Sequence, residues 1–69
     1  MQLHFVAVFY NNRWHYYYEN EHGEGWSHDI REAMPIKSLA KAEKIKQHFE
    51  SKEDFINRVG DPEVMSIKY

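Results

Sequence analysis

The 69-residue chain is long enough for one small domain, and its composition of 42% hydrophobic and 29% charged residues is that of a globular fold. The net charge of −2 excludes a generally basic nucleic-acid binder, and the lack of cysteine excludes disulfides and a thiolate zinc site. No apolar run approaches the length of a membrane span and no signal-peptide pattern is present, so we expect a cytoplasmic protein without a membrane partner.

Residues 2–19 predict a β-hairpin. Two segments, 2–10 and 13–19, are rich in aromatic and β-branched side chains, which is typical of strands. The Asn11-Asn12 pair between them tolerates the positive φ angles of a tight two-residue turn. Such a turn fixes the register and divides the side chains into two sets, one on each face of the hairpin.

The two faces of this hairpin differ in composition. The side chains of the first face are almost wholly apolar, and we expect that face to point into the core. They pair across the strands as Phe9 with Trp14, Ala7 with Tyr16, and Phe5 with Tyr18. The second face mixes apolar, aromatic and polar side chains, and it stays exposed if one helix covers only the first. It holds Val6, Val8, Tyr10, Arg13, His15 and Tyr17, with His4 opposite Glu19.

The middle of the chain predicts a loop followed by the main helix. Residues 20–29 are polar and contain two glycines, so we expect a loop. Residues 30–36 allow a short third strand, which Pro35 restricts to a sheet edge because proline cannot donate a ladder hydrogen bond. Ser38 is a favourable N-cap for a helix over 38–49. At about 100° per residue, one face of this helix gathers the apolar side chains of Leu39, Ala42, Ile45 and Phe49.

The C-terminal part predicts a second short helix and a closing strand. The sequence from Ser51 to Asp54 has the form of a capping box, which predicts a short helix over 52–59. Gly60 suits the position after this helix, because glycine adopts positive φ without strain. Residues 63–69 alternate in hydropathy, as a half-buried strand does.

The predicted fold is α+β, and residues 1–69 form a single domain. Its small antiparallel sheet has three to four strands, contributed by the hairpin 2–19 and the closing strand 63–69, with helix 38–49 packed on one face. A sheet with one open face and two unpaired edges gains stability from self-association, so we expect a homodimer.

The expected function is non-catalytic protein binding. The second hairpin face is a contiguous patch of residue types that interface hot spots favour. It predicts a surface that binds another protein or a second copy of this chain, through Val6, Val8, Tyr10, Arg13, His15 and Tyr17. A short cysteine-free chain with an aromatic strand suits an accessory protein of a phage or a bacterium.

The alternative is nucleic-acid binding by the main helix. Five of the nine lysines and arginines lie within 37–52, and a helical wheel places four cationic side chains in one narrow sector. We call this the cationic sector; its members are Lys37, Lys41, Lys44 and His48. The net negative charge and the separation of the sector from the strand aromatics argue against this function.

No catalytic, cofactor or metal site is predicted. Ser27, His28 and Asp29 have the composition of a catalytic triad, but neighbouring side chains on one segment point in different directions. The five histidines lack the short spacing of a compact structural metal site. A domain of this size also leaves little interior for an enclosed pocket.

Overall fold

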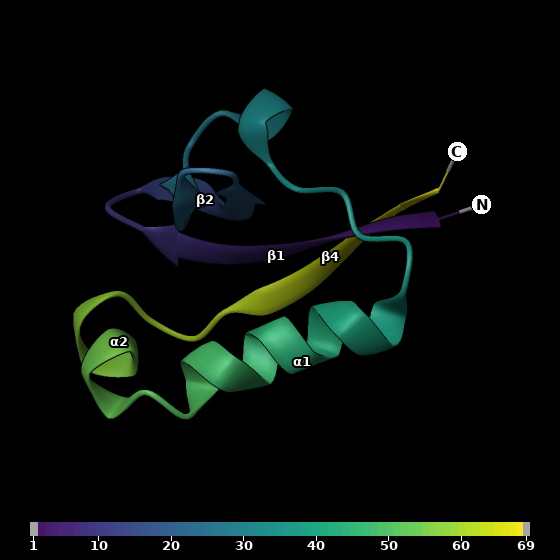
Figure 1. The fold of residues 1–69 in the computed structure, drawn as a ribbon. Helices are drawn as coiled ribbons and strands as arrows, with labels where there is room; N and C mark the ends of the chain where they lie inside the picture. Colours follow the sequence, from purple (N-terminus) through teal and green to yellow (C-terminus); the bar gives the residue numbers. More distant parts are fainter. Residues whose placement is uncertain (1, 69) are drawn as a thin grey trace.

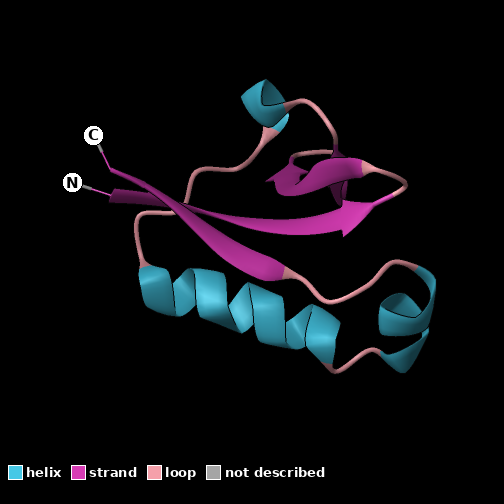
Figure 2. Ribbon diagram, turned by 180° about the vertical axis from the view of Figure 1, so that it is seen from behind, coloured by secondary structure: helices cyan, strands magenta, loops and turns pink. Residues whose placement is uncertain are grey.

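The computed structural model describes residues 2–68, which form an α+β domain with one antiparallel sheet. The elements are β1 (Gln2–Tyr10), β2 (Arg13–Asn20), β3 (Gly23–Ser27), the 3₁₀ turn η1 (Ile30–Glu32), α1 (Leu39–Glu50), α2 (Glu53–Arg58) and β4 (Glu63–Lys68). The strands lie in the order β3-β2-β1-β4, and α1 runs along one side of the sheet (Figure 1). The turn η1 lies on the opposite side from α1 (Figures 1 and 2).

The β1–β2 hairpin has the predicted two-residue turn. Asn11 and Asn12 have φ angles of 55° and 64°. Positive φ at both turn positions matches the right-handed twist of the flanking strands. The predicted register is confirmed over four pairs, from the turn as far as Ala7 with Tyr16.

Beyond the fourth pair the two strands separate, and the segment that leads into α1 fills the gap. The Met34 N–H donates to the Tyr17 carbonyl at 3.0 Å, and Ile36 exchanges two backbone hydrogen bonds with His4. Three hairpin pairs predicted beyond this point are not formed: Val6–Tyr17, Phe5–Tyr18 and His4–Glu19. The strand considered for 30–36 is reduced to a single bridge at Ile36, because η1 occupies the start of the segment.

The third strand is β3, in a segment for which the sequence predicts a loop. Gly23 and Gly25 have low strand propensity, which is why the local pattern gave the wrong prediction. Gly25 pairs with Tyr18, and a Cβ atom at Gly25 would lie 2.7 Å from the Tyr18 Oη atom. The Tyr18 ring therefore covers this glycine and supplies the packing that a side chain would otherwise give.

The closing strand is confirmed as far as Lys68, and Tyr69 lies outside the described residues. β4 pairs antiparallel with β1 from Gln2–Lys68 to Ala7–Glu63. β1 and β2 are therefore the two inner strands of the sheet. The middle residues of β1 are buried on both faces of the sheet, whereas Tyr17 is the one fully buried side chain of β2.

The two α-helices lie close to their predicted boundaries. Ser38 caps α1 by accepting a hydrogen bond from a first-turn N–H at 3.3 Å. α2 lies within the predicted range 52–59, but the predicted capping box is wrong. Ser51 instead closes α1, where its hydroxyl donates to the His48 carbonyl at 2.8 Å. Gly60 follows α2 with a φ of 125°, a conformation that favours glycine.

The prediction of which hairpin face is buried is wrong. Four side chains of the predicted exposed face are buried: His4, Val6, Val8 and Tyr17. Val6 and Tyr17 belong to the core cluster with Ala42 and Phe49 of α1, and Ile45 packs against it, whereas Leu39 is exposed. β3 adds Trp26 to this side of the sheet, with its ring centroid 5.1 Å from that of Phe49. Contacts with α1 and β3 select the buried face, and neither element belongs to the hairpin pattern.

Candidate protein-binding surface

The side of the sheet away from α1 carries a band of apolar and aromatic side chains. Along β1 and β2 these residues alternate with those that face α1, and the pairing of β1 with β4 continues the band onto the edge strand. We call this surface the open face; its apolar members are Leu3, Phe5, Ala7, Phe9, Trp14, Tyr16, Tyr18, Met65 and Ile67.

The most exposed apolar side chains of the open face lie at its two ends. Phe9, beside the hairpin turn, is 52% exposed, and its ring lies edge-on to Trp14 at a centroid distance of 5.3 Å. Ile67, near the end of β4, is 46% exposed. Phe5 and Ala7 lie between these ends and are buried. The open face therefore has a closely packed centre between two exposed apolar ends.

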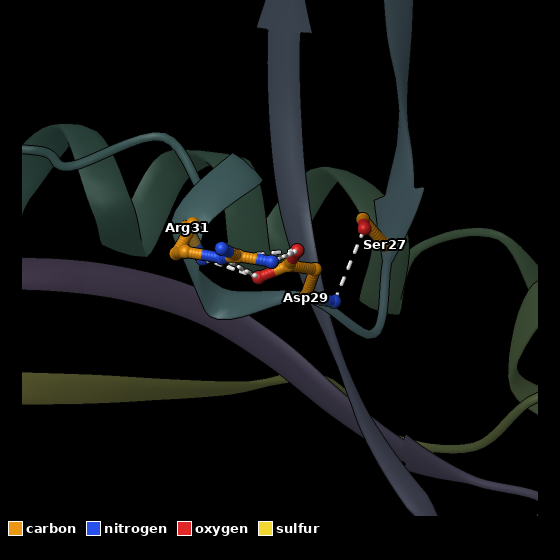
Figure 3. A network of polar contacts seen from close by, with 3 residues as sticks. All are labelled: Ser27, Asp29 and Arg31. Carbon is orange, nitrogen blue, oxygen red and sulfur yellow. Dashed lines mark hydrogen bonds and ion pairs between the residues drawn. The ribbon is translucent and has the colours of Figure 1, made fainter.

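The turn η1 borders the open face. It lies beside β2, on the side of the sheet away from α1 (Figures 1 and 2). The Asp29 carboxylate accepts hydrogen bonds from the Arg31 backbone N–H and from its guanidinium, both at 2.9 Å, while the Asp29 N–H donates to Ser27 Oγ (Figure 3). Arg31 thereby holds the pKa of the Asp29 carboxyl below its usual range. Ile30 in this turn is exposed and adds an apolar side chain beside the open face.

The open face is nearly free of charge. Within residues 2–68, Glu63 is the one charged side chain that the strand registers place on it, opposite Ala7. Arg31 in the bordering turn is already paired with Asp29. Binding of single-stranded nucleic acid requires aromatic rings in a positive groove, which this surface does not offer. An apolar protein surface is the better chemical match.

The residues predicted to bind a partner are divided by the fold. Val6, Val8 and Tyr17 are buried, so they are not available to a partner. Tyr10 and Arg13 are exposed at the hairpin turn, on the side of the sheet that carries α1. His15 is half-buried, and its Nε2 atom lies 3.1 Å from the Tyr10 carbonyl oxygen. Phe9, which the alternation pattern assigned to the core, is instead 52% exposed, and Trp14 and Tyr16 of the same set are half-buried.

Tyr17 has a structural role that its sequence position did not reveal. Its hydroxyl donates to carboxylate oxygens of Glu19 at 2.9 Å and of Glu24 at 2.7 Å. One phenol proton is shared between two carboxylates on neighbouring strands. Burial of the ring and these two carboxylates raise the pKa of Tyr17 well above its usual value. The interaction joins the ends of β2 and β3 beside the core.

The cationic sector is exposed. Lys37, Lys41, Lys44 and His48 all face solvent, and none of them forms an ion pair within residues 2–68. Lys46 lies outside the sector, and its ammonium group is paired with Glu50 at 2.8 Å. The four side chains of the sector thus keep their donors available to an anion.

The triad-like sequence and the histidines do not come together as a site. The Asp29 carboxylate is held by Arg31, and Ser27 is linked to Asp29 only through the Asp29 backbone N–H (Figure 3). The rings of His15 and His28 lie 6.4 Å apart. Across the described part of the chain, no group of three histidine, cysteine, aspartate or glutamate side chains is placed to hold a metal ion.

Comparison with protein families, with curated proteins and with solved structures finds no match for this chain. Over residues 2–68, no helix combines the length and apolar character needed to cross a membrane. The cytoplasmic location and the phage or bacterial origin stay predictions from the sequence.

Proposed function

We propose that this protein is a non-catalytic protein-binding module whose open face docks onto an apolar surface of another protein. The observation that carries the proposal is the exposure of Phe9 and Ile67 on a sheet face that no α-helix covers within residues 2–68. Contiguous apolar patches on small proteins are typical of contact surfaces. Aromatic residues such as Trp14 and Tyr16 are also enriched in interface hot spots.

The test compares two adjacent aromatic residues on opposite faces of β1. Phe9 and Tyr10 are similarly exposed, at 52% and 46%, but Phe9 lies on the open face and Tyr10 on the side that carries α1. The immobilised chain first captures a protein from an extract of its source cell. That protein is then identified, purified and titrated against Phe9→Ser and Tyr10→Ser.

The proposal predicts that Phe9→Ser loses affinity at least about tenfold and that Tyr10→Ser binds as the original chain does. Circular dichroism checks that both variants remain folded. Equal binding by all three chains, or loss by Tyr10→Ser alone, would contradict docking through the open face.

The exposed cationic sector supports nucleic-acid binding as a second candidate function. Lys41 and Lys44 lie within one turn of α1 and face solvent, so they can contact neighbouring phosphates as point charges. This function predicts retardation of a DNA or RNA duplex at low salt that Lys41→Gln with Lys44→Gln abolishes. No retardation at any salt concentration would eliminate it.

A further inference from the structure

β4 is an edge strand of the sheet, with β1 on one side and no strand on the other in the described part of the chain. The backbone of His4 in β1 bonds to Ile36, on the side of β1 away from β4. Backbone groups alternate in direction along a strand, so the N–H and C=O groups of Leu3 and Phe5, the neighbours of His4, point toward β4. Their partners in β4 are Ile67 and Met65.

The same alternation gives the direction of the remaining β4 groups. Since Met65 and Ile67 bond to β1, the N–H and C=O groups of Val64, Ser66 and Lys68 point out of the sheet. No backbone hydrogen bond within residues 2–68 uses these outward groups. A strand edge of this kind is a template for another strand.

The other edge of the sheet is less suited to pairing. β3 has five residues, of which two are glycines, and its outward groups are those of Glu24 and Trp26. A short edge with a charged residue is one of the ways in which proteins prevent strand addition. β4 is longer, and its one proline neighbour, Pro62, precedes the strand.

We propose that β4 pairs antiparallel with β4 of a second copy of this chain, around a two-fold axis at Ser66. A two-fold axis perpendicular to the sheet keeps the helices of both copies on the same side. In this register Ser66 lies opposite Ser66 of the second copy, and Val64 lies opposite Lys68. The outward groups of all three residues then find partners in the other copy.

The neighbouring register satisfies fewer backbone groups. If the axis passed through Met65, Lys68 would lie opposite Pro62, which has no N–H to donate. That register also places the Glu63 carboxylate opposite the apolar side chain of Ile67. Pairing centred on Ser66 avoids both conflicts.

The side chains support the same register. On the open face, Met65 of each copy lies opposite Ile67 of the other, so the 46% exposed Ile67 side chain gains an apolar neighbour. On the side of α1, Val64 lies opposite the aliphatic part of Lys68. No two like charges oppose each other. These matches favour a second copy over an unrelated extended segment.

A six-residue strand spans about 20 Å, so the seam is small and the dimer is expected to dissociate on dilution. Pairing joins the two open faces into one surface, but it does not require the partner protein proposed above. Failure of either proposal therefore leaves the other standing.

The matched variants are Ser66→Pro and Ser66→Ala. Proline removes an outward N–H that makes no bond to β1, and it is tolerated at such edge positions. Both variants lose the contact between Ser66 Oγ and His4 Nδ1 at 2.6 Å, so alanine controls for that loss. Sedimentation over a wide concentration range should show dimers for the original chain and Ser66→Ala, and a monomer for Ser66→Pro.

Hydrogen exchange measured by NMR gives a readout that needs no variant. The amides of Met65 and Ile67 should be protected at every concentration, whereas those of Val64, Ser66 and Lys68 should become protected only as the dimer forms. Ile67→Lys, at an exposed side chain, should weaken dimerisation at least about tenfold if Ser66→Pro fails to fold. A chain that is monomeric throughout, or a dimer whose outward β4 amides exchange freely, would overturn the proposal.

Discussion

Replacement of Tyr17 by alanine should unfold the protein, although Tyr17 lies on the hairpin face for which alternation predicts exposure. The side chain is 3% exposed, and its ring lies edge-on to Trp26 and Phe49 with centroids 5.6 Å away in both cases. Its hydroxyl is shared by Glu19 and Glu24. Tyr17→Ala therefore removes a ring from the core and a polar link between two strands.

The expected loss is as large as the whole stability of the domain. Truncation of a buried aromatic ring to alanine costs about 3–5 kcal/mol. Loss of a hydroxyl bonded to charged groups adds about 1–3 kcal/mol. A domain of this size is stable by roughly 3–5 kcal/mol. Phe9→Ala, at a half-exposed position, should cost about 1–2 kcal/mol and leave the chain folded.

Urea unfolding followed by circular dichroism distinguishes the two variants. The original chain and Phe9→Ala should give cooperative transitions, with a lower midpoint for Phe9→Ala, while Tyr17→Ala should give no folded baseline. If Tyr17→Ala unfolds near the original midpoint and Phe9→Ala does not fold, α1 covers the other face and the reasoning is refuted.

The ionisation of Tyr17, the backbone strain at Gly60 and the caps of the two α-helices give further predictions. The pKa of Tyr17 is raised in the folded state, so its contribution to stability is complete below the ordinary tyrosine pKa of about 10 and declines above it. Tyr17→Phe should flatten that alkaline decline in urea unfolding, and an unchanged decline would contradict it. Gly60→Ala should lower the free energy of unfolding by about 1–3 kcal/mol, which is measured as a lower melting temperature. A Cβ atom has room at this position, but the φ of 125° strains the backbone of an alanine. Ser38→Ala should lower the free energy of unfolding by about 1 kcal/mol, because it removes the N-cap of α1. Ser51→Ala should leave the NMR chemical shifts of α2 helical, because Ser51 does not cap that helix.

Local signals in the sequence were sufficient for the elements that depend on neighbouring residues. The Asn11-Asn12 turn, the Ser38 cap and Gly60 each act through the conformation of a few consecutive residues. The register of the hairpin follows from the turn because strand residues alternate strictly. The main helix and the closing strand follow from the same kind of pattern, whereas the short helix was predicted from a capping box that does not form.

β3 and the separation of β1 from β2 depend on residues that are distant in the sequence. Gly25 becomes part of a strand because the Tyr18 ring covers it. The gap between β1 and β2 exists because Ile36 and Met34 supply hydrogen bonds to His4 and Tyr17 from another part of the chain. Strand propensity and turn chemistry contain no information about such contacts.

The choice of the buried face, and with it the candidate site, was decided only by tertiary structure. Alternation defines two sets of side chains, and the more apolar composition of the first set predicted that it faces the core. Both faces of the hairpin are apolar enough to be buried, so composition could not decide which of them α1 covers. α1 selects the set with Val6 and Tyr17 because β3 places Trp26 on the same side, where Phe49 packs against both rings. Sequence alone thus determined which residues share a face. Burial by a helix distant in the sequence determined that Phe9 and Trp14, rather than Val8 and Tyr17, remain accessible to a partner.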